Sequence, residues 1–426
     1  MYLNKLKSRI TRSEAAKSVA TLTLGTAIAQ LLTVVATPVL SRLFTPAEFG
    51  VLALFVSVAA VTATFVTLRY EIMILIPKEN REAEYLVHLC LFIAGCLGAI
   101  SALTSFIIPK YIRDLLGIGV LSSWLPWACF IGVAVAITTT SIGWLNRKKL
   151  YKEIAILRIV QSFLFVTIAI LLGIGSIQDG LLIAQVSSAL IMLILTIRCL
   201  PPLSIEAVRT FFSVAKIYSR APKYLLPTAL LDVITMQLPI ILIGIWYGTS
   251  EAGQFSLAWR VLVLPALLVG AAIGQVFFQR FSSTWPDSRV ALILLTDTWK
   301  VLALIGVLPM ILFVLSGEEL FSVVFGSDWA NSGKMAAILA PMLFASLLHS
   351  PTSTTSVVLG LQRQVFILSL FVLVYRPLSL YIGWKFGNIY IGLGIYCAVE
   401  ILQIIFFQLM VYRRIKMNFH SSRVAS

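Results

Sequence analysis

Seven ionisable side chains lie within long apolar runs of this 426-residue sequence: Arg158, Asp232, Arg260, Asp297, Lys300, Arg376 and Glu400. A charge facing lipid costs about 3 kcal/mol on insertion scales, so we expect these groups to face the protein interior or a water-filled cavity. Arginine presents a planar fork that matches phosphate oxygens, and a carboxylate inside a membrane can carry a proton or a small cation. The four basic groups outnumber the three acidic ones, which suggests a cationic passage. Asp232, Glu400 and Asp297 are candidates for coupling to H⁺ or Na⁺.

Simpler interpretations stand beside these. Asp297 and Lys300 are spaced i,i+3 and can pair with each other. The side chains of Arg158 and Lys300 lie near helix ends and can reach the head groups. Arg376 and Glu400 lie near the middle of two consecutive, antiparallel apolar runs. They form either a buried ion pair or part of a substrate contact, and the sequence leaves both open.

The elements that must position these residues are membrane-spanning helices. Hydrophobic residues make up 59% of the chain and charged residues 12%, about half of the usual charged share. A span needs about 20 apolar residues, and continuous runs of that length predict an all-α integral membrane protein with about twelve transmembrane helices. The predicted spans are 18–40, 50–68, 85–108, 120–144, 154–174, 180–197, 224–247, 252–279, 291–315, 335–359, 365–384 and 388–411. Arg69-Tyr70-Glu71 interrupts the apolar stretch after the second span.

Lys and Arg gather in alternate connections, as in Arg147-Lys148-Lys149, which predicts that both termini are cytoplasmic. The predicted organisation is a basic cytoplasmic N-terminus at 1–17, a first lobe at 18–197, and a cytoplasmic linker at 198–223. A second lobe at 224–412 and a cytoplasmic tail at 413–426 follow. The first apolar run is full helix length and lacks a cleavage signal, so we interpret it as a retained span.

The two lobes carry an internal repeat. Each begins with a proline-containing helix, a short outer connection and a second helix that opens on Glu-x-Gly. These are Glu48 and Gly50 in the first lobe and Glu251 and Gly253 in the second, at one common offset. Thr45 and Glu48 also have the spacing of a helix capping box. Two pseudo-symmetric six-helix lobes of the same orientation are predicted.

Several function classes are disfavoured. The net charge of +15 is spread over small basic groups between spans, so nucleic acid is not an expected partner. The cysteines and histidines match no metal-ligand spacing, and no metal or other cofactor is expected. His88 and His349 are interpreted as satisfied structural residues. A Gly-x-x-x-x-Gly-Lys phosphate loop is absent from the sequence, and we do not expect an enzyme.

The run PVLSRLFTPAEFGVLAL at 38–54 resembles the first-loop signature of bacterial polysaccharide (O-antigen type) flippases. These belong to the multidrug/oligosaccharidyl-lipid/polysaccharide exporter superfamily. Further similar stretches are LRYE at 68–71 with IPK at 76–78, FSLAWR at 255–260 through AIGQVFF at 272–278, and FGSDW at 325–329. The resemblance covers nearly the whole chain and is specific for the family rather than for site residues.

The resemblance implies a central cavity between the lobes and alternating access to the two sides of a bacterial inner membrane. The implied cargo is an undecaprenyl-pyrophosphate-linked oligosaccharide, moved to the outer leaflet for O-antigen, capsule or exopolysaccharide biosynthesis. Arg260, Arg376, Arg158 and Lys300 are the candidate contacts for its pyrophosphate and sugars. Membrane lipids, and polymerase and chain-length proteins of the same pathway, are the implied partners.

Two other functions fit parts of the sequence. A drug/cation antiporter of the same superfamily needs acidic groups in its cavity, for which Asp232 and Glu400 are available. A membrane glycan polymerase or ligase needs acidic residues on a sizeable outer loop. The longest predicted outer loop, 316–334, has few, so this alternative is the weaker one.

Overall fold

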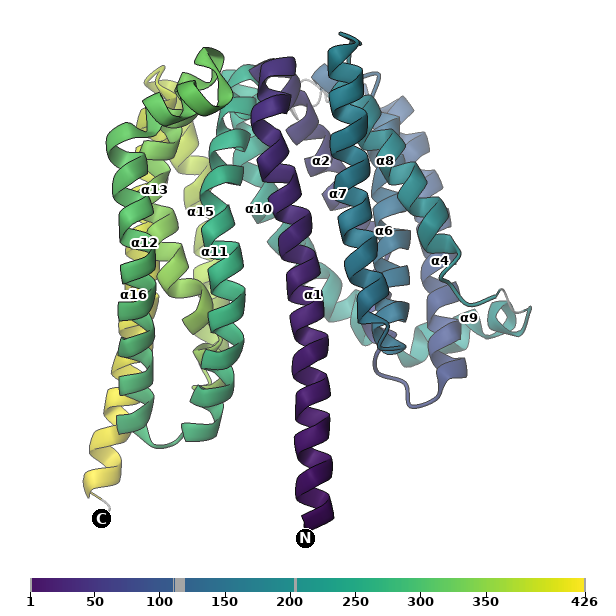
Figure 1. Ribbon diagram of the computed structural model, residues 1–426. Coiled ribbons are helices and arrows are strands. Elements are labelled where there is room, and N and C mark those ends of the chain that lie inside the picture. Colours follow the sequence, from purple (N-terminus) through teal and green to yellow (C-terminus); the bar gives the residue numbers. More distant parts are fainter. Residues whose placement is uncertain (1, 110, 112–118, 203–204, 425–426) are drawn as a thin grey trace. The chain divides into compact units, whose positions relative to one another are not determined.

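The computed structural model describes residues 2–109, 111, 119–202 and 205–424, and every regular element within them is helical. Twelve long helices correspond in order to the twelve predicted spans (Figure 1). They are α1 (Tyr2–Leu43), α2 (Pro46–Val66), α4 (Asn80–Ile107), α6 (Leu125–Arg147), α7 (Tyr151–Ile174), α8 (Gly180–Ile197), α10 (Leu226–Tyr247), α11 (Thr249–Thr284), α12 (Ser288–Phe325), α13 (Ala330–Thr352), α15 (Gln362–Lys385) and α16 (Ile389–Val424). The predicted all-helical class is confirmed.

Short elements connect them: α3 (Tyr70–Met73), η1 (Gly119–Leu121), α9 (Ile205–Ile217), the π-helical turn η2 (Ala221–Leu225), η3 (Ser327–Trp329) and α14 (Thr355–Val358). The backbone of the basic N-terminus at 1–17 is helical from Tyr2 onward. The side chains of that segment, and those of 418–426 in the tail, lie outside the described part of the chain.

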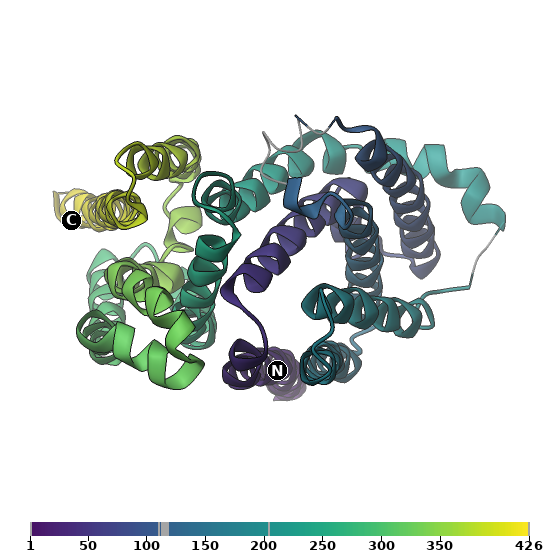
Figure 2. The same ribbon diagram turned by 90° about the horizontal axis from the view of Figure 1, so that it is seen from above.

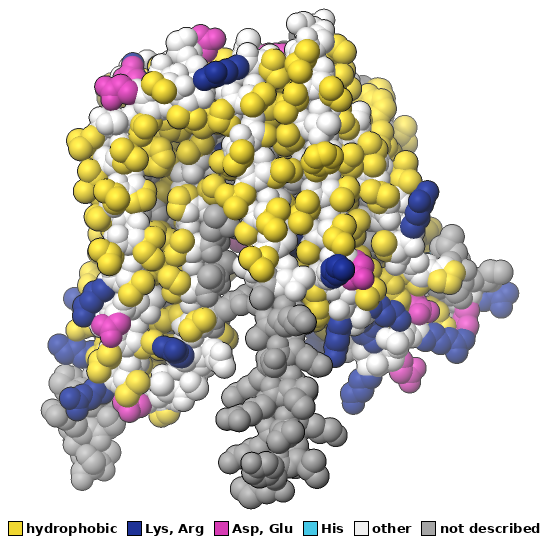
Figure 3. Space-filling model, in the orientation of Figure 1, with side chains coloured by type: hydrophobic (Ala, Val, Ile, Leu, Met, Phe, Trp, Pro, Cys, Tyr) yellow, Lys and Arg dark blue, Asp and Glu magenta, His cyan; other side chains and the backbone are white. Residues whose placement is uncertain are grey.

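Eleven of the described helices are long and apolar enough to cross a membrane. The remaining predicted span corresponds to α11, several of whose side chains are outside the described set. The number of spans and the cytoplasmic side of the termini stay predictions. Hydrophobic side chains cover most of the visible flanks of the helices, and most of the visible charged side chains lie toward the helix ends (Figure 3). This distribution suits helices surrounded by lipid.

The chain divides into two compact units, Met1–Ile245 and Trp246–Ser426. In the first, α1 packs on α7, where Gly25 faces Ala155, and α2 packs on α6, where Gly132 faces Thr62. In the second, α13 packs against α11, α12 and α16, and α15 packs on α16. Figure 2 shows many of these helices nearly end-on. The division falls within α10, and the predicted lobe boundary at 198–223 stays a prediction.

The predicted capping box is present at the start of α2. The hydroxyl of Thr45 accepts from the backbone N–H of Glu48, and the Glu48 carboxylate accepts from the backbone N–H of Thr45 at 2.8 Å. The corresponding helix α11 begins at the same offset that relates Glu48 to Glu251. It has Gly248 at its N-cap with φ of 94° and no side-chain cap. The two helices begin at equivalent positions of the repeat, but only the first turn of α2 has a side-chain cap.

The structure differs from the prediction at 316–334, which is mostly helical. α12 continues to Phe325 with a kink at Ser316, and η3 and the start of α13 follow. The reason is a close crossing of α12 and α13 at two glycines. A Cβ on Gly333 would lie 2.2 Å from the carbonyl oxygen of Gly317. The polar composition of this segment resembles a loop, but backbone packing keeps it helical.

Gly333→Ala is expected to destabilise the second unit by about 1–3 kcal/mol, because the methyl group meets backbone atoms that cannot rotate away. Gly394→Ala in α16 is the matched control, since a Cβ there has no heavy atom within 4 Å. Thermal unfolding of the detergent-purified variants measures the difference. Equal melting temperatures for the two variants would contradict the close crossing.

Candidate functional site

Arg376 and Glu400 form a buried ion pair between α15 and α16. Arg376 Nη2 lies 2.9 Å from Glu400 Oε1, and Nε lies 3.2 Å from Oε2, which gives the bidentate geometry of a strong pair. Their side chains are 15% and 13% exposed. Tyr375 donates its hydroxyl to the same carboxylate, and the Arg376 guanidinium carbon lies 5.6 Å from the centre of the Tyr396 ring. Of the two interpretations, the structure shows the ion pair.

A polar cavity lies farther along α16. Its volume is about 330 Å³, at the lower end of the range for small-ligand pockets. Nε2 of Gln408 lies 3.2 Å from His349 Nδ1 and donates to the hydroxyl of Thr352 at 2.8 Å. The cavity is lined by His349, Ser353, Thr354, Ser356, Val357, Val365, Leu368, Ser369, Gln403, Ile404 and Phe407.

Two features make this cavity a candidate binding site. The amide oxygen of Gln403, which lines the cavity, and that of Gln408, which lies behind His349 and Thr352, are buried and accept no hydrogen bond from the described residues. Buried acceptors of this kind need a donor, which water or a ligand hydroxyl can provide. The rings of His349 and Phe407 are nearly perpendicular with their centres 4.8 Å apart, so an apolar ring borders the polar groups. Hydroxyl donors together with an apolar face are what a sugar ring offers.

The histidines were the main omission of the sequence analysis. His349 lines this cavity, a position that its interpretation as a satisfied structural residue did not include, and its Nδ1 lies 3.2 Å from Gln408 Nε2. His88 is buried in α4, and neither of its ring nitrogens has a hydrogen-bond partner among the described residues. The available signal for His349 was the polar sequence Ser350 to Ser353 that follows it, at the end of a span.

Each of the other predicted residues has a different environment. Arg158 on α7 donates to the hydroxyl of Thr26 on α1. Lys300 and Asp297 pair at 3.2 Å on the exposed side of α12, as their spacing suggested. Arg260 is half-buried on α11, and Asp232 is exposed on α10. Among the described residues, neither Arg260 nor Asp232 has a salt-bridge partner.

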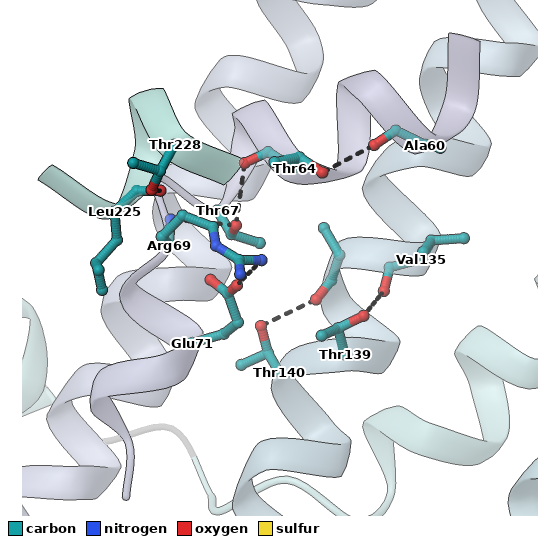
Figure 4. A network of polar contacts seen from close by, with 11 residues as sticks. Ala60, Thr64, Thr67, Arg69, Glu71, Val135, Thr139, Thr140, Leu225 and Thr228 are labelled. Carbon is teal, nitrogen blue, oxygen red and sulfur yellow. Dashed lines mark hydrogen bonds and ion pairs between the residues drawn. The ribbon is translucent and has the colours of Figure 1, made fainter. Parts of the chain in front are cut away.

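A second charged cluster marks the break after α2, where the sequence is interrupted by Arg69-Tyr70-Glu71. Leu68 and Arg69 adopt left-handed backbone angles, with φ of 47° and 64°. Figure 4 shows Arg69 and Glu71 pointing toward each other below Thr67, with 3.1 Å between Nη1 and Oε1. Glu71 is only 6% exposed. The pair neutralises a carboxylate that would otherwise be buried alone.

Arg147, at the end of α6, holds the segment that follows this break. Its guanidinium donates to the backbone oxygens of Ile74, Pro77, Lys78 and Glu79 and to the side-chain oxygen of Asn80. The shortest of these bonds, to Pro77, is 2.8 Å. Arg147 was recognised from the sequence only as a marker of orientation. The structure shows that it fixes the turn before α4.

A family model described as a polysaccharide biosynthesis protein matches residues 39–334. The chain belongs to the polysaccharide biosynthesis protein family. The match includes nearly all of the first-loop run at 38–54 and the three other stretches that carried the resemblance. It also includes the Arg69–Glu71 break and the Arg147 turn, while the Arg376–Glu400 pair lies beyond it.

Two curated proteins are similar to this polysaccharide biosynthesis protein at low sequence identity. The chain is 26% identical over 317 residues to the succinoglycan biosynthesis transport protein ExoT of Rhizobium meliloti, covering 72% of this chain and 61% of that one. It is 22% identical over 194 residues to the teichuronic acid biosynthesis protein TuaB of Bacillus subtilis, covering 45% and 40%. The matched regions thus span less than two thirds of either relative.

Two solved structures show which fold this family member adopts. The lipid II flippase MurJ in an inward closed conformation matches with a TM-score of 0.73 at 14% identity, covering 93% of this chain and 91% of that one. An inward-facing multidrug resistance MATE transporter of the MOP superfamily matches with a TM-score of 0.62 at 15% identity, covering 94% and 95%. The fold is that of the MOP superfamily, and the protein is a multi-pass protein of the bacterial inner membrane.

Proposed function

We propose that this protein moves a polyprenyl-pyrophosphate-linked oligosaccharide from the cytoplasmic to the outer leaflet, for assembly of a cell-surface polysaccharide. Membership of the polysaccharide biosynthesis protein family carries this proposal. The MOP fold supports it, because this fold is shared by a flippase and by transporters. One of the two relatives, ExoT, is named as a transport protein, which favours movement of a cargo over its chemical conversion.

The cargo has chemistry that the second unit can accommodate. Each sugar hydroxyl left unpaired in hydrocarbon costs several kcal/mol, so a passage for sugars must offer hydrogen bonds. The cavity beside His349 has hydroxyl and amide groups together with the ring of Phe407. We assign this cavity to a sugar residue of the oligosaccharide.

The pyrophosphate needs a cation that is not already paired within the protein, and Arg260 meets this condition best among the four candidates. Glu400 neutralises Arg376, and Arg158 donates to Thr26. Lys300 is paired and 77% exposed. Arg260 is half-buried without a carboxylate partner among the described residues, so an anionic cargo would stabilise it. Of the three candidate carboxylates, Asp297 pairs with Lys300 and Glu400 pairs with Arg376, whereas Asp232 has no salt-bridge partner among the described residues. Asp232 is therefore the best candidate for H⁺ or Na⁺ coupling.

Reconstitution tests the function directly. Proteoliposomes containing the purified chain should move a fluorescent polyprenyl-pyrophosphate oligosaccharide between leaflets faster than protein-free vesicles. The fraction of label accessible to a membrane-impermeant quencher measures the movement. Folded protein that moves no native cargo would contradict the proposal. Extension of the oligosaccharide would support a polymerase, and export of cationic drugs alone would support an antiporter.

Arg260→Gln is expected to slow this movement about 10- to 100-fold, because the cargo loses hydrogen bonds to a charged donor worth about 1.5–3 kcal/mol. Arg260→Lys should retain part of the rate, because it keeps the charge but lacks the bidentate fork. The quencher assay measures both variants beside Arg280→Gln, an exposed arginine near the end of the same helix. Equal rates for Arg260→Gln and Arg280→Gln would exclude Arg260 as the pyrophosphate contact.

A further inference from the structure

The helix α9, in the connection between α8 and α10, is fixed against the first unit by one of its faces. The hydroxyl of Tyr70 donates to the backbone oxygen of Ala215 at 3.1 Å, and Val214 is buried. The rings of Phe211 and Phe92 lie 5.1 Å apart. These contacts place α9 beside α4, a spanning helix whose Phe92 ring remains 55% exposed.

Polar bonds hold both ends of the helix. Arg81 pairs with Glu206 at its first turn, and this hydrogen bond lowers the pKa of Glu206. Just beyond its last residue, the hydroxyl of Tyr218 donates to Glu82 at 2.8 Å. Burial, followed by this bond to Glu82, raises the pKa of Tyr218 to about 12, so the donor keeps its proton at physiological pH. The position and rotation of α9 are thereby defined.

A different strip of α9 faces away from the protein. Phe212 is 93% exposed. Arg209 and Lys216, three residues before and four residues after it, are also exposed and lie beside it on the helix surface. Beyond the helix, Arg220 and Lys223 are exposed as well, and Glu206 is the only acidic residue of the whole 198–223 connection.

This strip has the composition of a helix that lies in a membrane surface. In such helices an aromatic side chain enters the boundary with the acyl chains, and neighbouring Lys and Arg reach the lipid phosphates. Figures 1 and 2 show α9 lying across the direction of α4 and extending outward from the bundle. On the neighbouring face of α9, the contact of Phe211 with the partly exposed Phe92 places the helix beside a spanning helix. The excess of cations fits an anionic lipid surface.

We infer that α9 is a membrane-surface anchor, which inserts Phe212 into the adjacent leaflet and binds anionic lipid head groups through Arg209 and Lys216. A soluble protein partner would also explain the exposed ring of Phe212, but α9 lies through Phe211 against a spanning helix, where lipid is the expected neighbour. The inference does not depend on the cargo. It concerns only α9, in the connection between α8 and α10.

Spin labels can locate the strip relative to the bilayer. A label on Phe212→Cys is compared with one on Ser213→Cys, the next residue, which points about 100° around the helix. Cys96, an exposed native cysteine, is replaced by serine in both. The full-length chain is reconstituted in phosphatidylcholine vesicles with and without phosphatidylglycerol. We expect the label at 212 to be accessible to oxygen and protected from a nickel chelate, and the label at 213 to show the reverse.

The charges are tested by Arg209→Gln with Lys216→Gln, which should abolish any gain in nickel protection at position 212 that phosphatidylglycerol produces. Lys148→Gln with Lys152→Gln, in another connection of the same unit, is the control of equal charge and should keep that gain. A label at 212 that is as open to nickel as the label at 213 in both bilayers would overturn the inference. Shielding of position 212 that requires added soluble protein would also overturn it.

Discussion

Arg376→Ala is expected to destabilise the folded protein by about 3–5 kcal/mol, because it leaves Glu400 buried without its cation. The Tyr375 hydroxyl cannot replace the charge, although it donates to the same carboxylate. Thermal unfolding in detergent, followed by the amount of monodisperse protein after heating, measures the loss. The exposed pair on α12 gives the comparison, since Lys300→Ala should cost less than about 1 kcal/mol.

A double variant separates a structural role from a role in transport. Arg376→Met with Glu400→Leu removes both charges, and replacing a whole buried pair by apolar side chains is often neutral or stabilising. We therefore expect the double variant to recover most of the lost stability. If it also recovers transport, the pair is structural. If it folds normally but does not transport, Arg376 or Glu400 contacts the cargo or a coupling ion. Full stability of Arg376→Ala alone would contradict the pairing.

Arg147→Ala is expected to have the second large effect, a loss of about 3 kcal/mol or more. One guanidinium serves four backbone oxygens and Asn80, and hydrogen bonds to charged groups contribute about 1.5–3 kcal/mol each. Arg147→Lys should recover little, because an ammonium cannot span these acceptors as a fork. Limited proteolysis at 74–80 and thermal unfolding measure the loosening of the turn.

Lys152→Ala is the control for Arg147→Ala, because it removes the same charge from the same connection and the Lys152 side chain is exposed. A similar effect of the two substitutions would mean that the charge acts on membrane orientation rather than on the turn. Resistance of 74–80 to proteolysis in the Arg147→Ala variant would show that other contacts hold this segment.

The predictable features were those set by residues close together in the sequence. The apolar runs predicted the long helices, and Thr45 with Glu48 predicted the start of α2, because a capping box needs only four consecutive residues. An ion pair of Arg376 and Glu400 was one of two open interpretations, since two antiparallel neighbouring helices bring such positions together. The polar run at 69–71 predicted an interruption of the helix.

The remaining features depend on contacts that a single sequence does not show. The left-handed angle of Arg69 and the burial of Glu71 follow from how α3 packs, rather than from local preference. The helical path of 316–334 depends on the meeting of Gly317 with Gly333, in two different helices. The cavity beside His349 combines residues from α13, α14, α15 and α16. A single histidine in the sequence does not indicate which residues of other helices will surround it.

The bonds of Arg147 have a consequence for the order in which the protein is built. Arg147 follows Asn80 by 67 residues, so the turn before α4 leaves the ribosome long before its anchor is made. At roughly 5–20 residues per second, this interval lasts on the order of several seconds. During that time the backbone oxygens that Arg147 later binds lack this donor. Completion of α6 supplies this donor, and the segment 206–218, made later still, adds the contacts to Tyr70, Arg81 and Glu82.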